Sequence, residues 1–166
     1  MTSVLFLCTG NAARSVMAGV ALRERRPDLT VETAGTLSVD GMPISWRTRA
    51  ALDDVGLPWP KHASRQAYRI DLHQSDLVIA LAPEHVQWVR REHADTAHRT
   101  STLIRLTKEL APPAAPLGER LAAMQLATVE LEPWEEVVDP GGGEVDAFIA
   151  CAREIVVLVD RLAELL

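Results

Sequence analysis

Short apolar segments alternate along this chain with longer segments whose apolar positions recur at helical spacing. Residues Ser3–Cys8 are almost continuously apolar and rich in strand-forming side chains, a pattern typical of the central strand of a parallel sheet. Further strands are predicted over Leu29–Thr33 and Asp76–Ala82, and a weaker one within Ser101–Leu106.

Helical periodicity follows most of these strands. Helices are predicted over residues 15–26, 44–55, a segment that Pro83 opens, 117–128 and 144–166. Ser15 is the expected cap of the first helix and Pro27 its stop, while Gly56 closes the second. Because strands alternate with helices, the sequence predicts an α/β fold with a parallel sheet and right-handed crossovers.

The chain length sets the number of domains. A chain of 166 residues can bury most of its apolar surface in one domain. The proline-rich segment 111–116 is too short to separate two domains, so we expect a single domain over residues 1–166. Ligands of parallel α/β sheets bind beyond the carboxyl ends of the strands, and Cys8 stands at such an end.

Composition and charge exclude several classes of protein. A net charge of −6, with no run of five or more Lys and Arg residues, argues against general nucleic-acid binding. No apolar stretch approaches the length of a membrane span, about 20 residues, and the N-terminus lacks the features of a signal peptide. Two cysteines, Cys8 and Cys151, do not form a secreted disulfide framework. We therefore expect a cytoplasmic protein without nucleic-acid or membrane partners.

The segment Cys8–Ser15, with the sequence CTGNAARS, joins the first predicted strand to the first predicted helix. Such a turn directs backbone N–H groups and the positive end of the helix dipole at one point, which favours an anion. Arg14 adds a planar fork that matches two oxygens of a phosphoryl group. The residues expected to surround the anion are Thr9, Gly10, Asn11, Ala12, Ala13 and Ser15.

The same electrostatic field would ionise the cysteine. Cysteines at helix N-termini have pKa values lowered to about 3.5–7.5, so Cys8 is a candidate nucleophile for covalent catalysis through a cysteinyl-phosphate. Ser15 can donate a hydrogen bond to its sulfur. The alternative is a cysteine that only packs in the core. A nucleotide-binding loop is excluded because no Gly-Lys-Ser/Thr follows the glycine.

A nucleophile of this kind needs an acid for the leaving group. Asp139, in the loop 132–143, is the best candidate, because Pro140 restricts the backbone there and the glycines that follow allow close approach. Asp-Pro is also a common turn signal.

Five motifs carry a resemblance to a known family: CTGNAARS, TAGT, HASRQ, SDLVIALAPEH and VVDPGGGEVDAF. Their order resembles that of the low-molecular-weight protein tyrosine phosphatases. The resemblance implies a doubly wound, four-stranded parallel sheet with helices on both faces, and metal-free, cofactor-free hydrolysis of phosphomonoesters. It implies that Cys8 is the nucleophile, Arg14 the phosphate clamp, Ser15 the thiolate partner and Asp139 the general acid. Asn11, Thr33 and His62 would form a hydrogen-bond network that holds the loop.

Several positions depart from the family pattern. Gly141, Gly142 and Val39 stand where many members have aromatic residues that pack against phosphotyrosine. Some motifs look closer to bacterial protein-arginine phosphatases of the same family, although those carry threonine at the position of Ala12. The expected substrate is therefore a phosphorylated protein or a small phosphomonoester, with phosphotyrosine preferred and phosphoarginine as the alternative.

Two other functions are alternatives to phosphatase activity. An arsenate reductase shares this fold but needs two more reactive cysteines, and this chain has only Cys151, which we expect to pack in the core. A non-catalytic phosphoprotein-binding module would lack the nucleophile or the acid, and both are present here. Trp134 is interpreted as a core residue. The histidines His85, His93 and His98 lack metal-ligand spacing and are expected on solvated faces.

Overall fold

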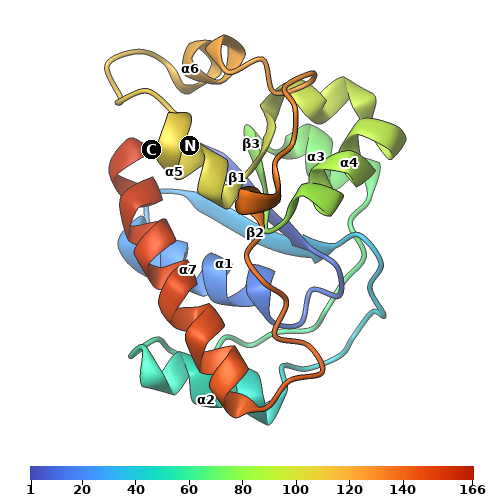
Figure 1. Ribbon diagram of the computed structural model, residues 1–166, viewed down its shortest axis with the longest axis vertical. Helices are drawn as coiled ribbons and strands as arrows, with labels where there is room; N and C mark the ends of the chain where they lie inside the picture. Colours follow the sequence, from blue (N-terminus) through green and yellow to red (C-terminus); the bar gives the residue numbers. More distant parts are fainter.

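The computed structural model describes residues 1–166 and contains a four-stranded parallel sheet with helices on both faces (Figure 1). The strands are β1 (Ser3–Cys8), β2 (Thr30–Gly35), β3 (Leu77–Ala80) and β4 (Thr100–Thr102), in the spatial order β2-β1-β3-β4. All three strand pairs are parallel. The predicted fold class is thus confirmed, with β1 in the interior of the sheet.

The helices connect the strands and close the chain. They are α1 (Arg14–Arg25), α2 (Trp46–Asp54), α3 (Arg69–Gln74), α4 (Pro83–Glu92), α5 (Leu103–Glu109), α6 (Leu117–Ala123) and α7 (Val145–Leu165), with short 3-10 helices η1 (Ala94–Arg99) and η2 (Pro133–Glu135). No helix combines the length and the apolar character needed to cross a membrane.

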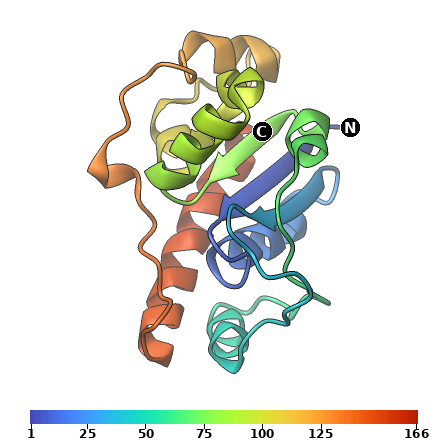
Figure 2. The same cartoon turned by 90° about the vertical axis from the view of Figure 1, so that its right-hand side faces the viewer.

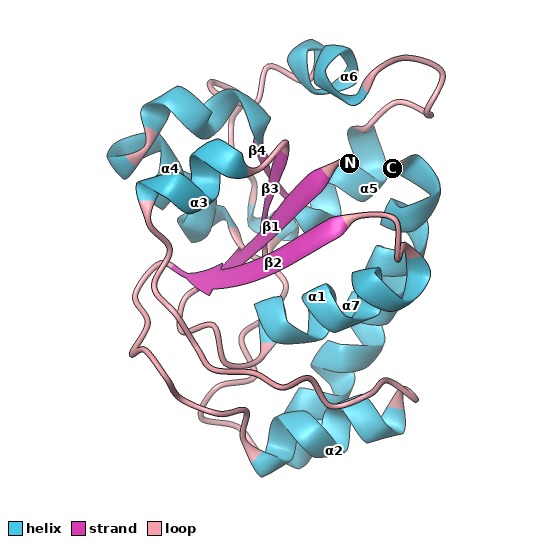
Figure 3. Ribbon diagram, turned by 180° about the vertical axis from the view of Figure 1, so that it is seen from behind, coloured by secondary structure: helices cyan, strands magenta, loops and turns pink.

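The side chains of β1 alternate between two apolar layers. Val4, Phe6 and Cys8 belong to the larger core, which α1, α5 and α7 cover, whereas Leu5 and Leu7 face a smaller cluster beneath α3 and α4. Figures 2 and 3 show the two helical layers on opposite faces of the sheet. This period of two buries β1 on both faces, as its continuous apolar sequence predicts.

Some predicted boundaries were wrong. Helix α1 begins at Arg14 behind Ala13, so Ser15 lies inside the first turn and is not the cap. The predicted strand 101–106 ends at Thr102, because the Thr102 hydroxyl accepts a hydrogen bond from the Arg105 N–H and starts α5. Helix α3 was not predicted, and α6 ends at Ala123 rather than at residue 128.

Candidate active site

The loop between β1 and α1 is fixed to the segment that follows β2. The N–H of Thr36 donates to the Cys8 carbonyl at 2.9 Å, and the Ser38 hydroxyl donates to the Gly10 carbonyl at 2.9 Å. Asn11 has a positive φ of 51°, in the left-handed region that asparagine tolerates better than most residues. We call residues 8–15 the phosphate loop.

Cys8 is buried at the start of the phosphate loop, at the carboxyl end of β1. Its Sγ atom lies 2.9 Å from the hydroxyl oxygen of Ser15, and no disulfide engages it. Ser15 lies in the first turn of α1, and the helix dipole stabilises a negative charge near that end of the helix. The geometry therefore brings together the predicted thiol and its predicted hydroxyl partner.

Asn11 joins the phosphate loop to β2 and to the loop that follows α2. Its Nδ2 donates to the hydroxyls of Ser15 and Thr33, both at 3.0 Å, and its Oδ1 accepts from the N–H of Arg65 at 3.0 Å. Asn11, Thr33 and Ser15 are all buried. Because every one of these bonds is internal, the loop conformation is set before any ligand arrives.

His62 supports the same loop from outside. Its Nε2 lies 2.7 Å from the Asn11 carbonyl oxygen, and because a carbonyl only accepts, Nε2 carries the proton. Burial lowers the pKa of His62, and the positive charge of Arg23 acts in the same direction, against the hydrogen bond to Asn11. The structure thus brings together Asn11, Thr33 and His62, the three predicted supporting residues.

Arg14 links the phosphate loop to the loop that contains Asp139. Its guanidinium is almost fully buried, donates from Nη1 to the Val137 carbonyl at 3.0 Å and lies 3.3 Å from Asp139 Oδ2 through Nη2. Asp139 is 56% exposed at its side chain, and its Oδ1 accepts from the Gly141 N–H at 2.9 Å. The predicted clamp and the predicted acid therefore meet, although 125 positions of sequence separate them: 139 − 14.

His85 is a site residue that the sequence analysis missed. It was expected on a solvated face, but its ring is 1% exposed and its Nε2 lies 3.0 Å from the Thr9 hydroxyl. Burial lowers its pKa to about 3, with a further contribution from the Arg14 charge, so the ring is neutral. His85 and Thr9 are 76 positions apart in the sequence. Only the tertiary structure, which places the start of α4 next to the end of β1, reveals their contact.

The three positions of the rim where the family pattern predicts aromatic residues, Val39, Gly141 and Gly142, carry no ring. Leu37 and Val39, after β2, and Val138, beside the acid, are all well exposed. Trp134 does not belong to the core as predicted: it lies on the surface against Arg105 and Lys108, with the Lys108 ammonium 4.1 Å from its ring centre. Trp134 therefore does not replace the aromatic residues that pack against phosphotyrosine in many members of the family.

Cys151 has a different environment from Cys8. It is buried in the larger core on α7, and burial raises the pKa of its thiol to about 12. Its predicted packing position is confirmed. A thiol with this pKa is a poor nucleophile, because the reactive form is the thiolate.

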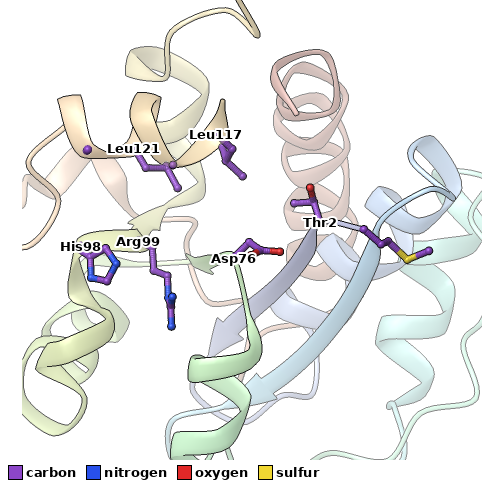
Figure 4. Close-up of a pocket in the computed structure, with 9 residues that line it drawn as sticks. Thr2, Asp76, His98, Arg99, Leu117 and Leu121 are labelled. Atoms are coloured by element: carbon purple, nitrogen blue, oxygen red, sulfur yellow. The ribbon is translucent and has the colours of Figure 1, made fainter. Parts of the chain in front are cut away.

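A second concave region lies at the opposite end of the sheet (Figure 4). This cavity of about 540 Å³ is lined by Thr2, Asp76, His98 and Arg99, which precede the strands, and by Leu117 and Leu121 of α6. It contains neither a cysteine nor a residue of the phosphate loop. In the whole chain, no three His, Cys, Asp or Glu side chains are grouped as metal ligands.

A parallel α/β sheet with a strand-to-helix loop at the carboxyl end of a central strand, and with a buried arginine and an aspartate in contact beside it, is typical of enzymes that bind phosphate groups. The family model described as "Low molecular weight phosphotyrosine protein phosphatase" matches residues 3–112. The chain belongs to this family, and it is a hydrolase of this phosphatase type.

Two curated relatives illustrate the range of the family. The protein-arginine-phosphatase of Geobacillus stearothermophilus is 26% identical over 162 residues, which cover 97% of this chain and 93% of the relative. A low molecular weight protein-tyrosine-phosphatase of Streptomyces coelicolor is 34% identical over 119 residues, or 68% of this chain and 71% of the relative.

Solved structures show the same architecture. The YwlE arginine phosphatase from Geobacillus stearothermophilus has a TM-score of 0.79 at 25% identity, covering 99% of this chain and 92% of its own. A low molecular weight protein tyrosine phosphatase from T. tengcongensis has a TM-score of 0.78 at 24% identity, with both chains covered completely, 100% each.

Proposed function

We propose that the protein hydrolyses phosphate from phosphorylated proteins through a cysteinyl-phosphate on Cys8. The observation that carries this proposal is a pair of contacts: the Cys8 thiol lies 2.9 Å from Ser15, the neighbour of Arg14 in the chain, and the buried Arg14 guanidinium lies 3.3 Å from Asp139. These contacts support a nucleophile at Cys8, an anion clamp at Arg14 and an acid at Asp139, which comes from a distant part of the chain. A purely structural cysteine would need none of these partners.

The first step transfers the phosphoryl group to sulfur. The Cys8 thiolate attacks phosphorus and forms the S–P bond while the bond from phosphorus to the leaving oxygen or nitrogen breaks. Asp139, as the carboxylic acid, gives its proton to the leaving atom, a contribution worth about 10²–10⁴-fold for general acids. The phosphate-loop N–H groups and the Arg14 fork stabilise the negative charge on the three equatorial oxygens.

The second step releases phosphate. Asp139, now a carboxylate, takes a proton from water, the water oxygen attacks phosphorus, and the S–P bond breaks to restore the thiolate. Ser15 donates a hydrogen bond to the departing sulfur from 2.9 Å, which favours the thiolate as a leaving group. The exposed side chain of Asp139 gives water access to the acid.

Phosphotyrosine on proteins is the substrate class we propose first, and phosphoarginine is the second candidate. The second rests on the relative named protein-arginine-phosphatase, which matches 97% of this chain. It is also supported by the aliphatic rim, because Val39 and Val138 offer no ring to pack against phosphotyrosine. An arsenate reductase is not supported, since Cys151 is a buried thiol whose pKa is raised.

A two-variant comparison tests the mechanism. Cys8→Ser should lower turnover of para-nitrophenyl phosphate by about 10³-fold or more in excess EDTA, as expected when a nucleophile is lost. Cys151→Ser is the matched control and should retain activity, because that thiol lies in the core. In the wild type, rapid acid quench during turnover should trap one phosphate per chain on Cys8. Full activity of Cys8→Ser would overturn the mechanism.

The substrate class is tested with matched peptides. Phosphotyrosine and phosphoarginine are placed in the same peptide sequence, with phosphoserine as the third arm, and kcat/KM is measured for each. A higher kcat/KM for phosphotyrosine supports the first candidate, and a higher value for phosphoarginine supports the second. A preference for phosphoserine would contradict both.

A further inference from the structure

A small polar cavity lies beside the supports of the phosphate loop, outside the catalytic site. It has a volume of about 210 Å³ and is lined by Arg23 of α1, Glu32 and Thr33 of β2, and Lys61, His62 and Arg65 of the loop after α2. We call it the basic pocket. Neither Cys8, Arg14 nor Asp139 lines it.

The charges of the basic pocket are unevenly balanced. Arg65 is paired, with its Nη1 2.8 Å from Asp71 and its Nη2 3.7 Å from Glu32. Arg23 forms no ion pair: its Nε and Nη2 donate to the Val31 carbonyl at 3.0 and 2.6 Å, which leaves Nη1 free to donate. Lys61 forms neither an ion pair nor a hydrogen bond. Glu32, whose charge also acts on Arg23, is the one carboxylate that lines the pocket, against the three cations Arg23, Lys61 and Arg65.

The size of the basic pocket limits what it can hold. Pockets for drug-sized ligands and cofactors have volumes of about 300–1,000 Å³, so a cavity of about 210 Å³ suits a smaller molecule. A guanidinium and an ammonium that lack carboxylate partners favour a compact oxyanion, since both bind phosphate and sulfate oxygens strongly.

We propose that the basic pocket is a second anion site, which binds a free inorganic oxyanion of the phosphate or sulfate type between Arg23 and Lys61. Three of its lining residues hold Asn11 in place. His62 meets the Asn11 carbonyl at 2.7 Å, Thr33 accepts from the Asn11 side chain at 3.0 Å, and the Arg65 N–H donates to the same side chain at 3.0 Å. The pocket therefore contacts the phosphate loop through the residues that set its conformation.

The coupling runs through His62. Its Nε2 is used by Asn11, whereas its Nδ1 makes no hydrogen bond within the chain. The charged groups that line the pocket with the ring are Arg23, Lys61, Arg65 and Glu32. Burial and the positive charge of Arg23 both lower the pKa of His62 and so disfavour a second proton. A bound oxyanion offsets that charge, favours the imidazolium and strengthens its hydrogen bond to the Asn11 carbonyl. The consequence for catalysis rests on the proposed function, but anion binding itself does not.

The test follows the His62 ring by NMR while sulfate replaces chloride at constant ionic strength. We expect sulfate to raise the pKa of His62 by about half a unit or more in the wild type. Lys61→Gln should lose most of this rise. Lys108→Gln is the matched control, because it removes the same charge from a lysine that lies against Trp134, and it should retain the rise.

Further arms separate this site from the catalytic one and define the ligand. Arg14→Met weakens anion binding at the phosphate loop and should leave the sulfate-induced rise in the pKa of His62 in place. If this variant does not fold, the comparison of Lys61→Gln with Lys108→Gln still tests whether the anion binds in the basic pocket. Inorganic phosphate should act like sulfate, whereas glucose 6-phosphate should need a higher concentration. An unchanged rise in Lys61→Gln, no rise in the wild type, or a stronger response to glucose 6-phosphate would overturn the proposal. Since none of these readouts is turnover, they hold even if Cys8 is not the nucleophile.

Discussion

The phosphate loop and the acid loop, residues 137–142, meet at one site but are built in opposite ways. The phosphate loop has buried side chains at Cys8, Asn11 and Ser15, and each of them is hydrogen-bonded to another part of the site. The acid loop is anchored by the Val137 N–H, which donates to the Leu81 carbonyl at 2.8 Å, while Asp139 is exposed.

The difference follows from what each loop has to do under the proposed mechanism. An anion cradle works best when its donors are already in place, because no reorganisation is then needed as charge develops. An acid that must also take a proton from water needs access to solvent. The buried, hydrogen-bonded environment of Cys8 and the solvent exposure of Asp139 are therefore complementary. Variants of the two loops should lose activity for different reasons.

After the loss of the Cys8 nucleophile, the largest effect is expected in the acid loop. Asp139→Asn should lower kcat by about 10²–10⁴-fold for aryl phosphates with poor leaving groups, because the proton donor is lost. The loss should shrink as the leaving group becomes a weaker base, and steady-state kinetics over a series of substituted phenyl phosphates measures this trend. An equal loss across the series would mean that Asp139 only positions Arg14.

The phosphate loop should fail through its conformation. Asn11→Ala removes three side-chain hydrogen bonds, to Ser15, Thr33 and Arg65, and places alanine at a φ of 51°. We expect a loss of about 2–4 kcal/mol in the free energy of unfolding, as for buried polar partners left unpaired, and a fall of about 10²-fold in kcat/KM from misplacement.

Two control variants separate the causes of the Asn11 effect. Asn11→Gly tolerates the positive φ but lacks the side-chain bonds, so it should recover only the backbone part of the loss. Thr33→Val removes one acceptor and should cost about 1 kcal/mol. Urea denaturation of the three variants measures the free energies. Wild-type stability in Asn11→Gly would show that the hydrogen bonds contribute nothing.

His85, beneath the phosphate loop, should make stability depend on pH. Because burial lowers its pKa to about 3 while an unfolded histidine titrates near its usual value, the unfolded chain binds more protons between these two values. The free energy of unfolding should therefore fall as the pH drops below about 6.5, by about 2 kcal/mol at pH 5.

Urea denaturation at pH 7 and pH 5 measures the His85 contribution. The variant His85→Gln should show a smaller difference between the two pH values than the wild type. His98→Gln, at an exposed position of η1, is the control and should keep the wild-type difference. Equal pH dependence in all three proteins would show that His85 is not a buried neutral ring.

The smallest effect is expected at Val39, a residue of the rim that belongs to neither loop. Val39→Tyr adds a ring beside the entrance, and one aromatic contact is worth about 0.5–1.5 kcal/mol beyond its buried area. We expect kcat/KM for a phosphotyrosine peptide to rise by about 2–10-fold. For para-nitrophenyl phosphate, kcat/KM should change in the same variant only as far as the ring of that substrate contacts the new tyrosine. A fall for the peptide would show that aliphatic side chains suit its substrate better.

Local sequence determined the phosphate loop. The continuous apolar run of β1, the turn CTGNAARS and the start of α1 are adjacent in the chain, and the spacing of Cys8 and Arg14 is fixed by one strand end and one helix turn. The cysteine, arginine and hydroxyl of this loop could therefore be predicted together. Asp139 was a candidate acid from its own loop, with Pro140 and the glycines beside it, whereas the roles of Thr33 and His62 came from the resemblance to the family.

Only the tertiary structure decided which distant residues complete the site. The neutral ring of His85 lies beneath Thr9 because α4 starts at the carboxyl end of β3, next to β1, and a lone histidine in a helical segment carries no signal of that neighbour. Trp134 lies on Arg105 and Lys108 rather than in the core for the same reason, since its partners belong to α5. Periodicity reports which face of an element is buried, whereas contacts between elements depend on how the sheet orders them in space.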